Sequence, residues 1–145
     1  MKFRTEYRQE LWQFQLSARR PLLLMGSCFT DNIGERMRRS DWDVGVNPCG
    51  VLFNPLSIAS AIERAVKDEV RFEDGFSWDF PTTFVSEEQC REAYAKVREA
   101  LERSQALVVT FGTAVAYFRD GEVVANCHKH PSCEFDRRML PVEQM

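Results

Sequence analysis

The chain has 145 residues, of which 44% are hydrophobic and 28% are charged, and its formal net charge at pH 7 is −3. This length and composition predict a single globular domain with a buried core, and the acidic balance argues against a nucleic-acid-binding surface. No apolar stretch approaches the ~20 residues of a membrane-spanning helix, and the first residues lack the apolar core of a secretory signal. Five cysteines at irregular spacing are typical of reduced thiols, so we expect a cytoplasmic protein.

Two regions are expected along the chain. Residues 1–20 mix scattered aromatic and polar side chains, and we predict an N-terminal arm that packs its aromatic rings on the remainder. Residues 21–145 contain no internal repeat, no low-complexity stretch and no linker, so this region is expected to form one domain.

The domain opens on a strand, a turn and a helix. The apolar run Leu22–Met25 predicts a short buried strand, and Gly26 permits a sharp turn after it. Thr30 or Asp31 would then cap the first helix. Ser27 is therefore expected where a strand has ended and a helix is about to begin.

The middle of the chain predicts a second strand and two more helices. Residues 43–46 have the pattern of a strand, and the turn-rich residues 47–50 follow it as a loop. Asn54-Pro55 has the cap and first-turn signature of a helix. Residues 71–83 are acidic and aromatic and are expected to cover one end of the sheet. A capping box predicts a long helix over residues 86–104.

The last third of the chain predicts strands and a final helix. Residues 106–111 are the most hydrophobic strand candidate and are expected at the centre of the sheet. Asp120-Gly121 predicts a β-hairpin within residues 115–125. A helix is expected over residues 132–139, and residues 141–145 have the pattern of the start of another.

This order of elements predicts an α/β fold: a mostly parallel sheet flanked by helices, with an added β-hairpin near residues 115–125. In open α/β sheets, ligands bind at the edge where the carboxyl ends of the strands gather. Ser27, the loop at residues 47–50 and Gly112-Thr113 are expected to meet at that edge.

Ser27 is the candidate nucleophile. A serine between a strand and a helix projects past the sheet, where the following amides and the helix dipole face a developing anion. A nucleophile also needs a base and oxyanion donors. From the residue pattern alone, a helix-capping or turn role for Ser27 is the commoner explanation.

Four segments resemble the GSCFA family: Gly26–Thr30, with Thr30 where the family name has Ala, Val46–Pro55, Thr110–Ala114 and Asn126–Lys129. This family is grouped with the SGNH/GDSL hydrolases, so the resemblance implies an SGNH/flavodoxin-like fold. It also implies an esterase or acylhydrolase, acting on a small-molecule or carbohydrate ester without a cofactor. The nucleophile would be the serine after the first strand, which is Ser27.

The resemblance suggests the donors of an oxyanion hole. Gly50 matches the place of an SGNH glycine whose backbone amide enters that hole, although a turn glycine is an equally good explanation. The amide of Cys28 follows the nucleophile, and Asn47 could add a side-chain donor.

SGNH hydrolases have a third sequence block, in which a glycine, a variable residue and an asparagine follow a strand, and this chain matches it in part. Gly112 and Thr113 fit it, but Ala114 stands where these hydrolases have an oxyanion-binding asparagine. Loss of one such donor costs about a hundred- to a thousandfold in rate. The side chain of Asn47, Asn126 or Thr113 would therefore have to substitute, or the site is not an ordinary esterase site.

The sequence offers no clear candidate for the general base. The two histidines are His128 and His130, and neither follows an aspartate by three residues as in the late Asp-x-x-His segment of SGNH hydrolases. Because the family domain is longer, the resemblance implies a domain truncated at its carboxyl end, with the base beyond Met145. His128 stays a candidate catalytic residue, with a structural loop role equally open. A truncated sheet would expose an edge that a homo-oligomer could cover.

Two other classes of function remain open. The chain could be a non-catalytic ligand-binding domain on an SGNH-like scaffold. It could also be a thiol or metal protein centred on Cys28 or on Cys127 and Cys133, but no Cys-x-x-Cys pair occurs and we expect no metal site.

Overall fold

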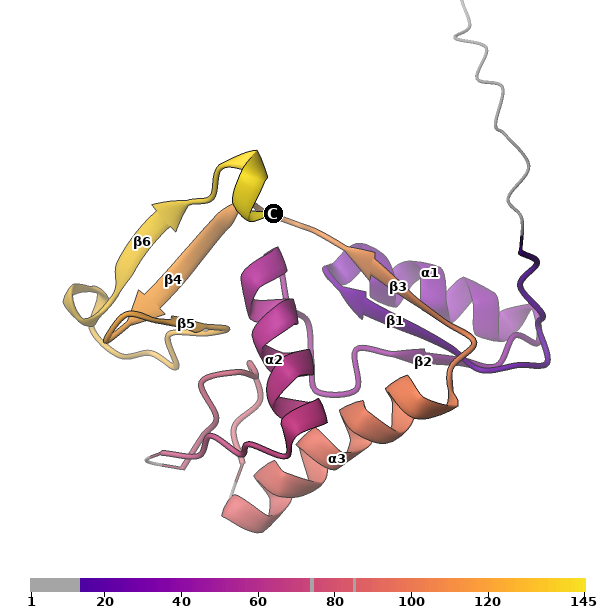
Figure 1. The fold of residues 1–145 in the computed structure, drawn as a ribbon, viewed down its shortest axis with the longest axis horizontal. Helices are drawn as coiled ribbons and strands as arrows, with labels where there is room; N and C mark the ends of the chain where they lie inside the picture. The colour runs from indigo at the N-terminus through magenta and orange to yellow at the C-terminus, as the bar shows by residue number, and fades with distance from the viewer. Residues whose placement is uncertain (1–13, 74, 85) are drawn as a thin grey trace, which may run out of the picture.

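The computed structural model describes residues 14–73, 75–84 and 86–145, so residues 1–13 of the predicted arm lie outside the described residues. The elements run in the order β1 (Leu22–Gly26), α1 (Cys28–Arg39), β2 (Val44–Val46), α2 (Pro55–Lys67), α3 (Glu87–Arg103), β3 (Ala106–Thr110), β4 (Val115–Arg119), β5 (Glu122–Val124), η1 (Ser132–Glu134), β6 (Asp136–Met139) and η2 (Val142–Gln144). Figure 1 shows α2 between a sheet of β1, β2 and β3 and a second sheet of β4, β5 and β6.

The first sheet is parallel, with strand order β2-β1-β3, which confirms the predicted α/β class with parallel strands. Its central strand β1 is buried on both faces, as parallel strands between helices are. Leu22 and Leu24 pack in one cluster with residues of α1, whereas Leu23 and Met25 pack in another with residues of α2 and α3. The two-residue period of a strand therefore places helices on both faces.

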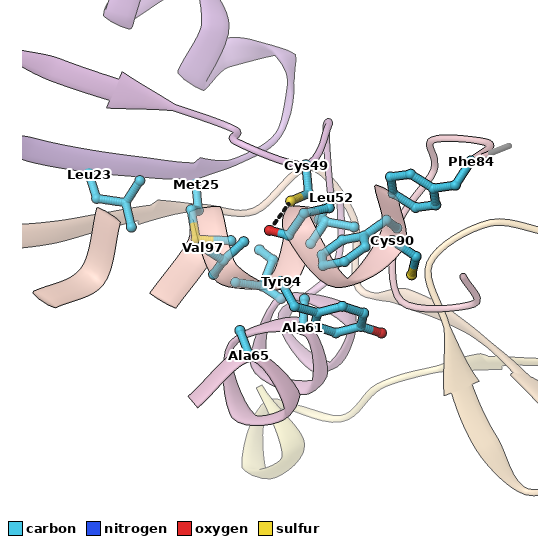
Figure 2. Close-up of a cluster of buried hydrophobic side chains, with 13 residues drawn as sticks. Leu23, Met25, Cys49, Leu52, Ala61, Ala65, Phe84, Cys90, Tyr94 and Val97 are labelled. Atoms are coloured by element: carbon cyan, nitrogen blue, oxygen red, sulfur yellow. Dashed lines mark hydrogen bonds between the residues drawn. The ribbon is translucent and has the colours of Figure 1, made fainter. Parts of the chain in front are cut away.

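Figure 2 shows the larger of these two clusters. Side chains of β1, α2 and α3 converge there, and the loop after β2 adds Cys49 and Leu52. The Cys49 thiol donates a hydrogen bond to the Ala93 carbonyl oxygen at 3.0 Å. Full burial of one large apolar side chain is worth about 1.5–3 kcal/mol, so this cluster fixes α2 and α3 against β1.

The helix caps of α2 and α3 follow their sequence signals. The Asn54 side chain accepts a hydrogen bond from the Ser57 amide at 2.9 Å, and Pro55 occupies the first turn of α2. The Ser86 hydroxyl oxygen accepts from the Gln89 amide at 3.2 Å at the start of α3. Both predicted helix starts are thus confirmed.

The start of α1 differs from the prediction. The helix begins at Cys28, with Ser27 at its N-cap, rather than after a cap at Thr30 or Asp31. Thr30 is fully buried inside the first turn. The earlier start follows from the tight turn at Gly26, which brings the chain directly from β1 into the helix.

The prediction that residues 106–111 form a central strand is wrong within the described part of the chain. β3 is an edge of the parallel sheet, and β1 is central. Leu107, Val108 and Val109 are each more than one third exposed. A continuous apolar run signals a strand suited to burial on both faces, but it does not say how many neighbouring strands are present.

The second sheet is antiparallel, with strand order β5-β4-β6. The predicted hairpin is confirmed, and Asp120 and Gly121 have φ values of 52° and 84°, as a two-residue type I′ turn requires. The predicted helix at 132–139 is wrong, because a short 3₁₀ turn leads into β6, which pairs with β4. A helix this short is marginal alone, whereas the strand satisfies backbone groups of β4.

The acidic and aromatic segment 71–83 is a packed excursion between α3 and the antiparallel sheet. Trp78 and Phe80 are fully buried. The Ala125 amide donates to the Trp78 carbonyl oxygen at 2.7 Å, and the hydroxyls of Ser77 and Tyr94 lie 3.0 Å apart. No helix among residues 14–73, 75–84 and 86–145 is long and apolar enough to span a membrane.

Candidate active site

Ser27 occupies the junction of β1 and α1. Its backbone is extended, its side chain is 5% exposed, and it is the N-cap residue of the helix. The hydroxyl nevertheless makes no capping hydrogen bond. It lies instead 3.2 Å from the hydroxyl of Thr110, the last residue of β3. Helix capping by the side chain therefore does not account for a serine at this position.

The first turn of α1 supplies amide donors beside Ser27. The first N–H groups of a helix have no acceptor within the helix, and the positive end of its dipole favours an anion there. The Thr30 amide is taken by the Ser27 carbonyl oxygen at 2.9 Å. The amides of Cys28 and Phe29 precede it in this turn, and the predicted oxyanion role of the Cys28 amide is compatible with that place.

Asn47 ties three segments together at the same edge. Its side-chain oxygen accepts from the Gly26 amide at 2.8 Å, and its Nδ2 donates to the Asp31 carboxylate at 2.7 Å. Its backbone φ of 41° is a left-handed value that Asn adopts more readily than most residues. The structure thus brings Asn47 to the end of β1, as expected, while its proposed role as an oxyanion donor stays a prediction.

Gly50 lies in the turn that follows Asn47. Its amide donates to the Asn47 carbonyl oxygen at 2.9 Å, and its φ is 100°. A Cβ at this position would stand 2.7 Å from Pro81 Cγ. The geometry of this turn therefore accounts for a glycine at position 50. The oxyanion role of its amide stays a prediction.

Gly112 covers Ser27 from the end of β3. A Cβ built on Gly112 would lie 3.0 Å from Ser27 Cβ and 2.9 Å from the Phe53 ring. The amides of Gly112 and Thr113 both donate to the Phe53 carbonyl oxygen, at 2.8 and 3.1 Å. The Thr113 hydroxyl oxygen accepts from the Val115 amide at 3.0 Å. The predicted convergence of these residues with Ser27 is therefore present, with their amides engaged by Phe53.

Three exposed phenylalanine rings belong to the segments that meet at Ser27. Phe29, Phe53 and Phe111, which we call the phenylalanine rim, are 59%, 47% and 54% exposed. Phe29 is on the first turn of α1, and the other two flank the Gly112 contact. Sequence patterns did not single out this rim, because each ring alone is compatible with a core position.

The structure does not place His128 beside Ser27. Its ring stacks on Phe76 at 4.3 Å, and its Nε2 lies 3.0 Å from the Ser77 carbonyl oxygen. Burial lowers the pKa of His128, and hydrogen bonds to the backbone of Ser77 and Phe80 partly offset this effect. The loop between β5 and β6 lies beside the antiparallel sheet, with α2 between it and the tip of β1 (Figure 1).

The cysteines do not gather into a site. Cys49 and Cys90 are buried, and burial raises the pKa of their thiols to about 12 and about 11. Burial also raises the pKa of Cys127. Across residues 14–73, 75–84 and 86–145, no group of three His, Cys, Asp or Glu side chains is placed to hold a metal ion.

Two contributors to the site were missed by sequence reasoning. Thr110 was taken as part of a strand and as the first residue of a GSCFA-like segment, and Thr30 as a helix cap at the end of another such segment, but neither side chain was given a role at the site. The signal that could have found Thr110 is the parallel register, which pairs it with Gly26 and so places it next to Ser27.

Comparison with known proteins identifies the family of the chain. The GSCFA family profile matches residues 21–145, which confirms the resemblance of the motifs. Neither the curated proteins nor the solved structures returned a match. Because the profile covers most of the chain, including Ser27 and every segment around it, the protein belongs to the GSCFA family.

Proposed function

We propose that this protein is a serine hydrolase of the SGNH/GDSL type that acts on a small-molecule or carbohydrate ester, with Ser27 as its nucleophile. The observation that carries the proposal is the position and hydrogen bonding of the Ser27 hydroxyl. It stands at the amino end of α1, is not used as a cap, and is held by Thr110 beside the first-turn amides. An SGNH-like scaffold is part of the same proposal.

The reaction would proceed by acyl transfer. Ser27 Oγ forms a bond to the ester carbonyl carbon while its proton passes to a base, and the carbonyl electron pair becomes an oxyanion. The amides of Cys28 and Phe29, in the first turn of α1, are the donors that we assign to that oxyanion. When the tetrahedral intermediate collapses, the bond to the alcohol breaks, the alcohol takes a proton, and water later releases the acyl group from Ser27.

The phenylalanine rim supports an apolar acyl part of the substrate. Its rings are exposed on the segments that meet at Ser27, which is itself 5% exposed. Each buried CH₂ group of an acyl chain is worth about 0.8 kcal/mol. We therefore expect kcat/KM to rise from acetyl to hexanoyl esters, by roughly two- to fourfold for each added CH₂ group.

The proposal is tested by labelling with a fluorophosphonate probe and by turnover of p-nitrophenyl esters, on the full-length protein. Wild-type protein should carry the label on Ser27, located by peptide mass spectrometry. Ser27→Ala should lose label and turnover, by up to about 10⁶-fold, with an unchanged circular dichroism spectrum. Ser132→Ala, which alters an exposed serine in η1, is the matched control and should keep both. Equal turnover by Ser27→Ala and wild type would overturn the proposal.

A second candidate is a ligand-binding domain without catalysis. The observation that favours it is that Thr110 is the only side-chain hydrogen-bond partner of Ser27 Oγ in the part of the chain that the structure describes, so no base contacts the serine there. In that case Ser27→Ala would keep its affinity for an ester ligand, and no wild-type label would form.

The setting of the protein completes the proposal. Five free thiols suit a reducing compartment, and we propose a cytoplasmic protein. Among the described residues the outer edge of β3 has no neighbouring strand, which suits self-association.

A further inference from the structure

The Thr110 hydroxyl is the centre of a small, partly buried hydrogen-bond network. It lies 3.2 Å from Ser27 Oγ, accepts from the Ser27 amide at 3.2 Å, and is hydrogen-bonded to the Thr30 hydroxyl. Thr30 is fully buried, and this bond to Thr110 is the one hydrogen bond of its hydroxyl in the described residues. Three segments, β3, the end of β1 and α1, are joined at this one oxygen.

A count of protons restricts what the network can do. A threonine hydroxyl has one proton to donate and two lone pairs to accept with. The Ser27 amide donates to one lone pair of Thr110 Oγ1 and shares its proton with the Thr110 carbonyl oxygen, each at 3.2 Å. Thr110 must then donate to one of its two hydroxyl neighbours, Ser27 or Thr30, and accept from the other.

The two arrangements have different consequences for Ser27. If Thr30 donates to Thr110, both lone pairs of Thr110 are filled and its proton points at Ser27 Oγ. The proton of Ser27 is then directed away from Thr110, where a base can take it. Once Ser27 loses its proton, this arrangement alone is possible, since an alkoxide can only accept.

We propose that Thr110 is a positioning residue for the nucleophile and that Thr30 sets the direction of its proton. Thr110 holds Ser27 Oγ by donating to it, and the bond strengthens as negative charge develops on that oxygen. A separation of 3.2 Å is long for two hydroxyls, so the contact has room to shorten. Ser27 and Thr30 are buried and Thr110 is half-buried, which limits competition by water. The inference rests on the proposed function of Ser27.

The test compares variants that remove or keep the hydroxyl. Thr110→Val preserves the shape of the side chain without its hydroxyl, whereas Thr110→Ser keeps the hydroxyl. We expect Thr110→Val to lower the rate of Ser27 labelling and kcat by about 10- to 100-fold, the effect of one hydrogen bond to a charged group, with KM nearly unchanged. Thr110→Ser should stay within about threefold of wild type.

A double variant separates positioning from a structural role. Thr110→Val leaves the buried Thr30 hydroxyl without its partner, which could disturb α1 by itself. In Thr110→Val with Thr30→Ala that orphaned hydroxyl is gone. The thermal midpoint should then recover toward that of wild type, while the labelling rate stays as low as in Thr110→Val alone.

The outcomes separate the inference from the proposed function. If Ser27 of wild-type protein is not labelled, both fall. If wild-type protein is labelled and Thr110→Val reacts equally fast, the proposed function stands and the positioning role of Thr110 is overturned. Recovery of the labelling rate in the double variant would also overturn it, because Thr110 would then act only through the packing of Thr30.

Discussion

The carbonyl oxygen of Thr110 stands where a side chain on residue 26 would have to begin. A Cβ built on Gly26 would lie 2.0 Å from this oxygen, and Gly26 has a φ of +139°. Gly26→Ala must therefore both strain the backbone and push β1 away from β3. We expect it to lower the free energy of unfolding by at least about 3 kcal/mol, measured by urea denaturation with tryptophan fluorescence.

Gly121→Ala is the matched control for this variant. Gly121 also has a positive φ, +84°, but nothing lies within 4 Å of a Cβ built on it. Its substitution should cost only the backbone strain, about 1–2 kcal/mol. Equal losses in the two variants would show that the close approach of Thr110 contributes nothing.

Gly112→Ala should impair the proposed reactivity of Ser27 more than the fold. The added methyl would press on Ser27 Cβ at 3.0 Å and on the half-exposed Phe53 ring, which can swing aside. Because a displacement of about 1 Å costs roughly 10²-fold in a positioned reaction, labelling of Ser27 should slow by about that factor. The thermal midpoint should change little, and an unchanged labelling rate would contradict the contact.

Asp79 should be a major contributor to stability. This carboxylate is 1% exposed, accepts from the Tyr94 hydroxyl at 2.6 Å and from the Ser60 hydroxyl at 3.1 Å, and lies 3.3 Å from Arg64 Nε. Burial raises the pKa of Tyr94, so its hydroxyl remains a donor. Asp79→Asn should lower the free energy of unfolding by about 3 kcal/mol.

The comparison for Asp79 is Glu63→Gln, which breaks an exposed pair with Lys67. Exposed ion pairs contribute little, so its denaturation midpoint should match wild type in the same experiment. A midpoint for Asp79→Asn that also matches wild type would show that the buried network is dispensable.

His128 should make stability depend on pH. Burial lowers the pKa of its imidazole below the ordinary value of 6.5, so the unfolded chain binds a proton more readily than the folded one. Its contribution is then complete above about pH 6.5 and is lost as the pH falls below that value. An NMR titration of the His128 ring checks the cause directly, and a midpoint at or above 6.5 would refute it.

The edge of β3 should drive self-association. Leu107, Val108 and Val109 expose 39%, 39% and 37% of their surface along an edge with no neighbouring strand in the described residues. Such edges template pairing with a second copy. Wild-type protein should therefore sediment as a dimer or larger species at micromolar concentration, and Val108→Lys should shift it toward the monomer. Val66→Lys, on the exposed face of α2, should leave the assembly unchanged.

Local signals in the sequence carried much of the fold. Asn54 and Ser86 predicted the starts of their helices correctly, because a capping side chain acts within three residues. Asp120-Gly121 predicted its hairpin correctly, because a two-residue turn is also a local feature. The segment at 132–139 was misjudged because its conformation depends on pairing with β4, which lies elsewhere in the chain. The same limit applies to β3, whose place in the sheet is set by its neighbours and not by its own apolar run.

In the candidate site too, features set by neighbouring residues could be predicted, whereas contacts between distant segments could not. Ser27 could be found from the residues beside it, since a strand, a glycine and a helix are read locally. Thr110 could not, because its contact with Ser27 depends on the register of two strands far apart in sequence. The side-chain bonds of Asn47 to Gly26 and Asp31 likewise require the folded turn to be known.

The contact between Ser27 and Thr110 also sets when the site can exist. The two residues are 83 positions apart in the chain, with α1, β2, α2 and α3 between them. Such non-local pairing carries a large loop-closure cost and slows folding. During synthesis at about 5–20 residues per second, Ser27 would emerge roughly 4–17 s before Thr110. Under the proposed function, Ser27 would therefore be held in place only after β3 has been made, and the nascent chain would stay inactive until then.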